Sequence, residues 1–347
     1  MNRLGWVGLA CLATTQAWAW GDLGHQTVAA IAWKRLDQRV KIEVAHILMR
    51  GDSVDGQRNN EPFTHKLTVP TIPDALLTTA YLDEYVQPAF VQSATWPDDI
   101  KRGKSLNFDS FIDELNVTFS HDHVGDTEKE RCKSWHYLDY PLVMNADGTV
   151  IEGKVEQYPF SPSNAVSALN EVIKPRLSPI PMDGKATPDK RAVYLFFLNH
   201  IVGDLHQPLH CVSVYGSQFP KLGDAGGNLF TLANKSNLHR VWDGGIDQAA
   251  KDAGLQRRGA MTAFAIEVAG KWVAKSDEQP RIAEVEKQDP LRWVIEGRDL
   301  AISTAYAGIK MGDSPSPEYL TKVGATCKSQ AIVAGYRLGE AINRLLK

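Results

Sequence analysis

Apolar residues recur every three or four positions along most of the chain, a spacing typical of amphipathic helices. This pattern predicts helices over 28–36, 39–49, 74–92, 164–177, 188–208 and much of 246–346. Polar, glycine-rich or irregular composition predicts loops at 51–73, 102–131 and 212–227. Alternation typical of strands is scarce, and only 149–155 and 282–286 could pair as short strands. Since no linker or internal repeat divides the chain, the predicted fold class is mainly α, in a single domain.

The residues with metal-binding chemistry concentrate at the end of the central apolar helix, within 199–210. His200 and Asp204 are four residues apart, which on a helix places both side chains on one face, one turn apart. Pro208 has no backbone N–H and its ring crowds the carbonyl of Asp204, so the helix should bend or end there and direct His210 toward the same centre. Zinc takes imidazole nitrogen and carboxylate oxygen as ligands. The stretch therefore favours a metal site over a buried helix with satisfied polar groups.

Other stretches also carry possible ligands. His239 and Asp243 repeat the four-residue spacing, which would rarely arise twice by chance. Trp96-Pro97-Asp98 is typical of a helix start with proline and an acid in the first turn, although Asp98 is also a possible ligand. His136 lies between Trp135 and Tyr137 and combines a possible ligand with aromatic neighbours. His121-Asp122-His123 could bind a metal, but its polar surroundings favour an exposed loop.

The first 19 residues have the features of a secretory signal peptide. Arg3 precedes an apolar run over 4–12, and Ala17-Trp18-Ala19 forms a cleavage motif. The run is too short to span a bilayer, and no later run is long and apolar enough to do so. We therefore expect a secreted or periplasmic protein with the signal peptide at 1–19, cut between Ala19 and Trp20. The α-amino group of Trp20, with His25 close by, would be a possible metal ligand once deprotonated.

The charge balance limits how the protein could bind nucleic acid. The mature chain would carry 37 basic and 41 acidic residues, so it lacks the global positive field that attracts a polyanion. Any phosphate binding would have to come from a local site, such as a metal cluster. After cleavage Cys132, Cys211 and Cys327 remain, which in an oxidising compartment allow one disulfide bond and one free thiol. The sequence leaves the three possible pairings open.

Taken in order, these motifs resemble those of the zinc-dependent, single-strand-specific type I nucleases of fungi, plants and bacteria. That family shares its fold with the bacterial zinc phospholipases C. The matching motifs are Trp20 with Gly24-His25, Trp96-Pro97-Asp98, Trp135-His136-Tyr137, His200-x3-Asp204-x5-His210, Gly226-Gly227-Asn228 and His239-x3-Asp243. The resemblance implies one mainly helical nuclease domain, residues 20–347, around a trinuclear zinc cluster.

The resemblance also implies a ligand set for each of three Zn²⁺ ions. One ion would be held by Asp98, His136, His200 and Asp204. A close partner ion would be held by main-chain atoms of Trp20, by His25 and by Asp204, which would bridge the two ions. The third ion would be held by His210, His239 and Asp243. His206 matches no ligand position and would lie behind the ligands or at the surface.

The same resemblance implies where a nucleotide would bind. Tyr137 would stack on a base, and Asp139 would form a hydrogen bond with the base edge. Ala225, Gly227 and Asn228 would form the opposite wall, and Lys101 would lie near the phosphate. The carboxylates expected to take part in catalysis are Asp98, Asp139 and Asp204. Since a stacking slot needs an unpaired base, single strands would be preferred over duplexes.

The expected function is that of a secreted zinc phosphodiesterase that cleaves single-stranded DNA and RNA to 5′-phosphorylated products. The resemblance also implies 3′-nucleotidase activity, and we expect a monomer with no stable protein partner. A zinc phospholipase C is the alternative, although Asp243 favours the nucleases because the phospholipases usually have Glu there. A purely structural zinc protein is disfavoured, because structural sites usually consist of Cys and His. The segments 51–95 and 102–131 look longer than in fungal members, so substrate preference stays open.

Overall fold

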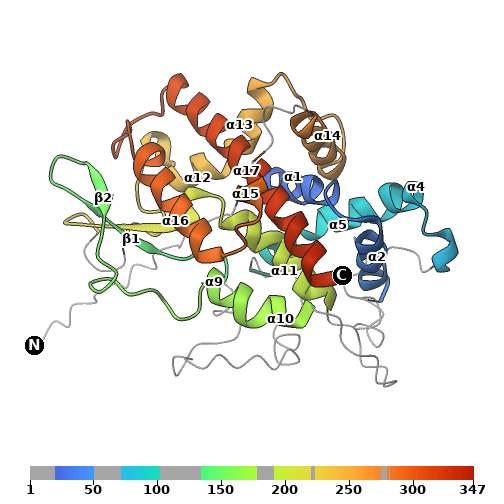
Figure 1. The fold of residues 1–347 in the computed structure, drawn as a ribbon. Coiled ribbons are helices and arrows are strands. Elements are labelled where there is room, and N and C mark those ends of the chain that lie inside the picture. Colours follow the sequence, from blue (N-terminus) through green and yellow to red (C-terminus); the bar gives the residue numbers. More distant parts are fainter. Residues whose placement is uncertain are drawn as a thin grey trace, which may run out of the picture.

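A computed structural model describes residues 20–50, 72–101, 134–177, 191–219, 223–274, 280 and 282–347 of the chain. Its α-helices are α1 (Asp22–Trp33), α2 (Gln38–Arg50), α4 (Thr79–Tyr81), α5 (Gln87–Ser93), α6 (Trp96–Lys101), α9 (Ala165–Ser167), α10 (Lys174–Leu177), α11 (Arg191–Asp204), α12 (Leu238–Asp243), α13 (Gly245–Asp252), α14 (Met261–Val273), α15 (Ile282–Val285), α16 (Pro290–Leu300) and α17 (Pro317–Leu346). Short 3₁₀ or π segments are η2 (Asp74–Leu76), η3 (Leu82–Val86), η4 (Ala168–Ile173), η5 (Pro208–His210), η6 (Ala233–Lys235) and η8 (Ala301–Ala305). The prediction of a mainly α fold is therefore confirmed (Figure 1).

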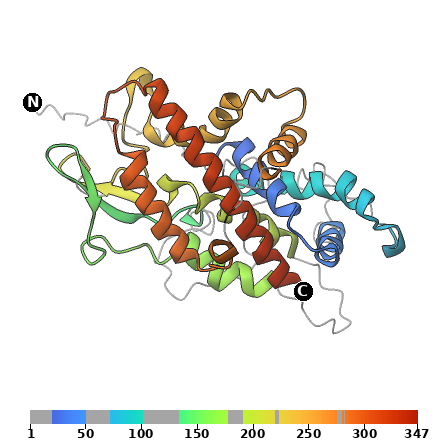
Figure 2. The ribbon, with the colours of Figure 1, turned by 45° about the horizontal axis from the view of Figure 1, so that its top comes forward.

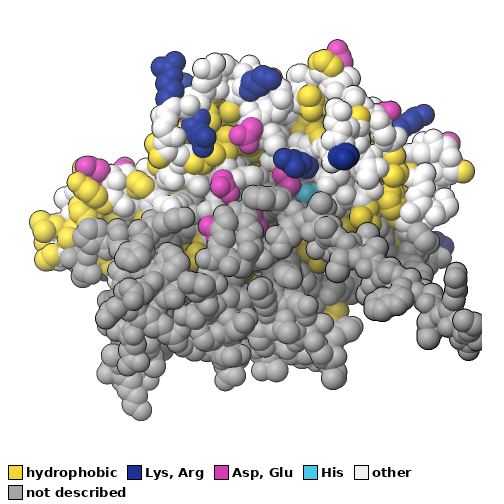
Figure 3. Space-filling view, turned by 180° about the vertical axis from the view of Figure 1, so that it is seen from behind, with side chains coloured by type: hydrophobic (Ala, Val, Ile, Leu, Met, Phe, Trp, Pro, Cys, Tyr) yellow, Lys and Arg dark blue, Asp and Glu magenta, His cyan; other side chains and the backbone are white. Residues whose placement is uncertain are grey.

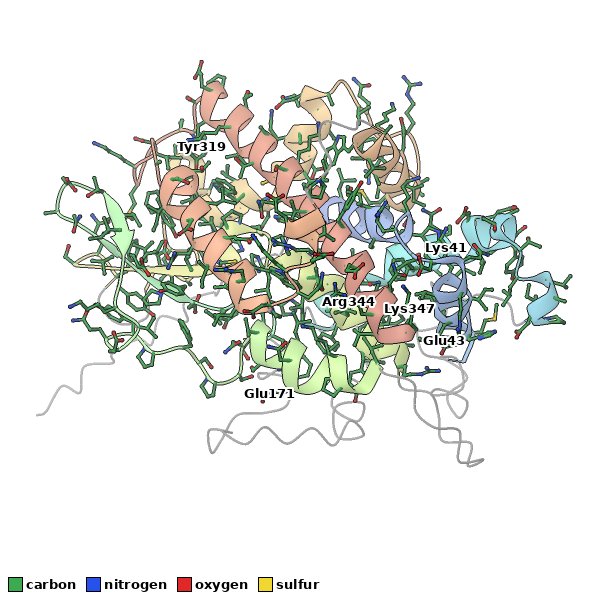
Figure 4. All side chains as sticks on the ribbon, viewed as in Figure 1. Lys41, Glu43, Glu171, Tyr319, Arg344 and Lys347 are labelled. Carbon is green, nitrogen blue, oxygen red and sulfur yellow. The ribbon has the colours of Figure 1, made fainter. Side chains whose placement is uncertain are left out.

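Helix α17 runs diagonally across the molecule and packs on α1, α11 and α13 (Figures 1 and 2). It begins at Ser316, whose side chain accepts a hydrogen bond from the backbone N–H of Tyr319, with Pro317 in the first turn. Figure 4 shows Tyr319 near one end of this helix and Lys347 at the other, close to Lys41 and Glu43 of α2. The helix therefore ties distant parts of the chain into one core.

A small three-stranded sheet lies at one end of the molecule, at the left of Figure 1, in the order β2-β1-β3. Strand β1 (Tyr140–Met144) pairs antiparallel with β2 (Val150–Glu152) and parallel with β3 (Val212–Tyr215). Two sequence expectations were wrong here. The predicted loop 212–227 begins with strand β3, and 149–155 pairs with β1 rather than with 282–286, which forms helix α15. A strand of three to five residues gives too short an alternation to reveal its partner.

Several expectations fall on residues outside the described part of the chain. These are the signal peptide at 1–19, the predicted loop at 102–131, most of the loop at 51–73 and Cys132. Cys211 and Cys327 are both buried and carry free thiols. Among the described helices, none combines the length and the apolar character needed to cross a lipid bilayer.

Candidate metal centre

Helix α11 delivers the central side chains. Every residue from Arg191 to Asp204 is buried, so this helix is enclosed by protein on all sides and its polar residues must face partners. The helix ends at Asp204, and Pro208 begins the 3₁₀ turn that carries His210. The Gln207 side chain accepts a hydrogen bond from the Leu209 backbone N–H at 2.6 Å and fixes this turn. The predicted end of the helix near Pro208 is confirmed.

Asp204 lies between four histidine side chains. Its Oδ2 is 3.1 Å from His136 Nδ1 and 3.2 Å from His200 Nε2. Its Oδ1 is 3.4 Å from His25 Nε2 and 3.6 Å from His210 Nδ1. A single buried carboxylate therefore contacts rings from α1, from the segment before β1, from α11 and from η5.

Asp98 of α6 and His25 of α1 complete the first part of the cluster. The Asp98 Oδ1 atom is 3.8 Å from His200 Nε2 and 3.9 Å from His136 Nδ1. The ring of His25 stacks on that of His200, with centroids 3.8 Å apart. The chain can bring α1 this close to α11 because Gly203 has no side chain. A Cβ there would be 3.0 Å from His25 Nδ1.

A second part of the cluster joins η5 to α12. The rings of His210 and His239 are 4.9 Å apart. The Asp243 Oδ1 atom is 3.5 Å from His239 Nε2 and 4.0 Å from His210 Nε2. Gln207 donates a hydrogen bond to the same Asp243 oxygen at 2.9 Å and orients this carboxylate. The two four-residue His–Asp pairs of the sequence thus lie on helices that meet at one centre.

Backbone carbonyls orient three of the rings. His200 Nδ1 donates to Ala94 O at 2.7 Å, and His239 Nδ1 donates to Gly226 O at 2.6 Å. His210 Nδ1 donates to His136 O at 2.8 Å. Such bonds fix the tautomer and turn the other nitrogen toward the cluster, an arrangement usual for metal-ligating histidines.

Electrostatics in the cluster favour a positive charge. Burial acts to lower the pKa of His200, but the carboxylates of Asp204 and Asp98 and the bond to Ala94 outweigh it, so the pKa is raised. Buried carboxylates in such a setting need a cation as partner.

The donor set therefore fits metal ions. Three groups each bring their donor atoms within 4.8 Å of one another, namely His25 with Asp98 and His200, His136 with His200 and Asp204, and His210 with His239 and Asp243. Imidazole nitrogens with carboxylate oxygens are a donor set that zinc accepts. The fold thus brings together all eight side chains expected as ligands. The first of them, His25, and the last, Asp243, are 218 positions apart in the sequence.

Trp20 lies two residues before the start of α1 and is fully buried. The next residue, Gly21, donates its N–H to the carbonyl of Asp243 at 3.1 Å. Gly24 makes room for Trp20, because a Cβ there would be 2.7 Å from the Trp20 Cβ. The backbone around Trp20 thus lies against the end of α12, beside the residue expected to hold the third ion.

A cluster of polar groups lies next to the histidines, between β1 and the loop 223–228. Burial, and then the charge of Asp224, raise the pKa of Asp139 to about 7. Burial, and then the Asp139 charge, raise the pKa of Tyr137 to about 12. The structure therefore places Tyr137 and Asp139 near each other but outside the three metal groups of the described residues.

The loop 223–228 has an unusual backbone that presents Ala225, Gly227 and Asn228. Ala225, Gly226 and Gly227 have φ of 53°, 61° and 84°, in the left-handed region. At Gly226 a Cβ would lie 2.3 Å from Leu209 O, so a side chain there would displace the η5 turn. Asn228 Nδ2 donates to Ala225 O at 2.8 Å and closes the loop. Lys101 ends α6, and its side chain lies outside the described part of the chain.

Sequence reasoning missed the groups that support this loop. Asp224 is fully buried, its Oδ1 accepts from the Val214 N–H at 2.8 Å, and its Oδ2 accepts from the Tyr306 hydroxyl at 2.6 Å. Burial raises the pKa of Asp224 to about 6, although these hydrogen bonds act to lower it. The only available signal was an acid directly before Ala225-Gly226-Gly227-Asn228.

Of the two places expected for His206, the structure excludes the surface. It is buried, its Nδ1 donates to Val202 O, and its Nε2 accepts from Arg337 Nη1 at 2.9 Å. Burial and the neighbouring Arg337 charge lower its pKa to about 3, so the ring is neutral. Arg337 in turn pairs with Glu296 at 2.7 Å. His206 therefore joins α11 to α17 and α16, away from the surface.

The space-filling view shows acidic and basic side chains close together on one face of the molecule. Near the middle of the face in Figure 3, a histidine side chain lies beside acidic side chains, with Lys and Arg side chains close by. Positive side chains around an acidic centre are compatible with a negatively charged substrate.

Comparison with known proteins gives a consistent result. The chain matches the model of the S1/P1 Nuclease family over residues 20–347. It is 24% identical to Endonuclease 1 of Arabidopsis thaliana over 275 residues, which cover 76% of this chain and 77% of that protein. Endonuclease 4 of the same plant is 22% identical over 337 residues, covering 95% of this chain and 90% of that protein. Endonuclease 2 is 31% identical over 159 residues, covering 44% of this chain and 51% of that protein.

Proposed function

The chain belongs to the S1/P1 nuclease family, and from this premise we propose that it is a zinc-dependent nuclease specific for single-stranded DNA and RNA. The family makes it a metal-dependent hydrolase of nucleic acid phosphodiesters, and the His and Asp groups supply the donors. We propose further that the products carry 5′-phosphates and that 3′-nucleotides are also hydrolysed.

The observation that carries this proposal is the position of Asp204, one buried carboxylate facing four histidines. We propose that one zinc ion would be held by Asp98, His136, His200 and Asp204. A second would be held by Trp20, His25 and the same Asp204. His210, His239 and Asp243 would hold the third. When bound, zinc ions supply Lewis acidity, which activates water and stabilises phosphoryl oxygens.

The residues of the chain have roles of their own in this proposal. Asp98, Asp204 and Asp243 hold negative charge in a buried site, which attracts and fixes cations there. Tyr137 offers a ring face to an unpaired base, and Asp139 offers a carboxyl group to the base edge. Ala225, Gly227 and Asn228 form the facing wall, held in place by Asp224. We also propose that the Lys101 side chain contacts the phosphate.

The test is turnover of the purified protein on single-stranded DNA and on phosphatidylcholine vesicles, side by side, with and without EDTA. EDTA-sensitive cleavage of DNA that leaves 5′-phosphates, with little lipid turnover, is the expected result. Cleavage of the lipid without cleavage of DNA would move the function to a zinc phospholipase C with the same cluster. Matched duplex DNA serves as the control for strand specificity, and we expect slower cleavage of it.

A second test concerns the N-terminus. We propose that the mature, secreted chain is one domain that begins at Trp20, a proposal supported by the family match, which starts at the same residue. Protein that begins at Trp20 should then bind one more zinc ion and cleave faster than protein with one extra residue before Trp20. Equal zinc content in both proteins would show that the terminal amino group is not a ligand.

A further inference from the structure

Two tyrosines form a stacked pair beside the proposed nucleotide site. The rings of Tyr158 and Tyr215 have centroids 3.9 Å apart and planes inclined by 16°. Aromatic pairs in proteins more often have centroids about 4.5–7 Å apart, offset or edge-on. The two rings therefore overlap almost face to face, as consecutive bases do in a nucleic acid. Both side chains are partly exposed.

The strand register places this pair on the same face as Asp139. Pro141 pairs with Ser213 and Val143 with Tyr215 in the parallel β1–β3 ladder. Side chains alternate along a strand, so Asp139, one residue before β1, shares a face with Ser213 and Tyr215. The charge of Asp139, after burial, contributes to a raised pKa of Tyr215, as expected for two side chains close together.

The loop 223–228 lies against the same face. Ala225 donates its N–H to Ser213 Oγ at 3.2 Å. A Cβ on Gly223 would be 3.2 Å from Tyr215 Cζ, so the start of the loop touches the Tyr215 ring. Tyr215 is thus held between the loop and Tyr158, which leaves Tyr158 as the ring that can offer its outer face.

We propose that Tyr158 and Tyr215 form a second stacking platform, which binds the base adjacent to the one held by Tyr137 and Asp139. The inference rests on the proposed nuclease function and adds a subsite to it. Ring stacking is indifferent to base identity, and nearby carboxyl groups of Asp139 and Asp224 disfavour a phosphate at this point, so the ligand is a base of a single strand. The platform would make the enzyme favour oligonucleotides over mononucleotides.

The test compares Tyr158→Leu with wild type on a 3′-mononucleotide and on a single-stranded hexanucleotide. Loss of one stacked base should raise KM for the hexanucleotide by about 5-fold to 150-fold. The ratio of kcat/KM for the hexanucleotide to that for the mononucleotide should fall by the same factor. Tyr158→Trp, which keeps a ring, should restore the ratio.

The matched control is Tyr85→Leu, which removes an exposed tyrosine from another tyrosine pair, Tyr81–Tyr85, with centroids 4.8 Å apart. It should leave the ratio unchanged. A Tyr158→Leu ratio equal to that of Tyr85→Leu, or an equal loss on both substrates, would overturn the platform. A loss confined to phosphatidylcholine vesicles would assign the pair to a lipid instead. Failure of wild type to cleave either nucleotide substrate would overturn the proposed function itself. Tyr158→Met, which also lacks a ring, covers the case in which the leucine variant does not fold.

Discussion

At the scale of single residues, Asp204 has the largest influence on the site. A carboxylate with no exposed surface is costly unless charged or hydrogen-bonding partners surround it. Here the partners are four histidine rings, three of them on elements other than α11. The arrangement holds the histidine nitrogens close together around one anion, which is the condition under which metal ions can join them.

We expect Asp204→Asn to abolish zinc binding at the bridged pair and to lower kcat by more than about a hundredfold. Mutation of residues that orient metal ligands typically lowers metal affinity or activity by about 10–100-fold, and loss of a ligand itself should lower them more. The measurements are zinc content by atomic emission and turnover of single-stranded DNA. Asp252→Asn is the control, because this exposed α13 side chain only accepts a hydrogen bond from the nearby Gln248 and lies outside the candidate metal centre. Retained zinc and full turnover in Asp204→Asn would refute the ligand assignment.

The pH dependence of stability should report on Asp139. Its pKa, raised to about 7, means that the folded chain binds a proton more tightly than the unfolded chain does. Stability from this group is therefore present at low pH and falls as pH rises from about 4 to about 7. Asp139→Asn has no such proton to lose. Relative to wild type, the variant should gain on the order of 1–2 kcal/mol of unfolding free energy over that range, after allowance for partial exposure.

Urea unfolding at pH 4 and at pH 7.5, both in EDTA so that metal binding adds no pH dependence, measures this difference. Asp147→Asn is a suitable control, because Asp147 lies in an exposed turn with a lowered pKa. A stability difference between Asp139→Asn and wild type that stays constant with pH would show that Asp139 titrates normally.

At the scale of elements, the contact of α1 with α17 positions His25. A Cβ on Gly335 would lie 2.5 Å from two atoms of Ile31 and 3.0 Å from Val28 O, so α17 packs directly on the α1 backbone. Gly335→Ala should destabilise the protein by about 1–3 kcal/mol, since overpacking outweighs the better helix propensity of Ala. It should also weaken zinc binding, because α1 would have to move. Thermal unfolding and zinc titration measure the two effects.

The matched control lies on α14, where a Cβ on Gly270 would meet no atom within 4 Å. Gly270→Ala should stabilise by about 0.5–1 kcal/mol and leave zinc binding unchanged. If both variants were stabilised alike, the close packing of α17 on α1 would be wrong.

The elements also show what the sequence could predict. Helices α2 and α11 follow from local apolar spacing, and the start of α6 follows from its proline and first-turn acid. The His–Asp pairs of α11 and α12 follow from the four-residue repeat. The parallel pairing of β1 with β3 joins residues about 70 positions apart in the sequence. Asp224 forms a hydrogen bond with Tyr306, which is 82 positions away. No local pattern encodes such partners, so the strand pairing was predicted wrongly and the support of the loop was missed. The same reason explains His206, whose partner Arg337 is 131 positions away.

At the scale of the whole molecule, the candidate metal centre joins segments that otherwise have separate packing. Its candidate ligands come from α1, α6, the segment before β1, α11, η5 and α12. The α1, α13, α14 and α17 helices pack on one another through apolar side chains such as Ile31, Ala265 and Ile332. The metal should therefore add stability to a structure that already has a core.

Removal of zinc should lower the melting temperature without unfolding the helices. A ligand present at a hundred times its dissociation constant stabilises by about 2.7 kcal/mol, which for a domain of this size corresponds to roughly 5 °C. Far-ultraviolet circular dichroism after dialysis against EDTA should retain most of the helical signal at 25 °C, and readdition of zinc should restore the melting temperature. Magnesium is the control, because it prefers all-oxygen octahedral sites and should not replace zinc among histidines. Loss of the helical signal in EDTA would instead make the metal centre, not the α1–α17 packing, the part of the molecule on which folding depends.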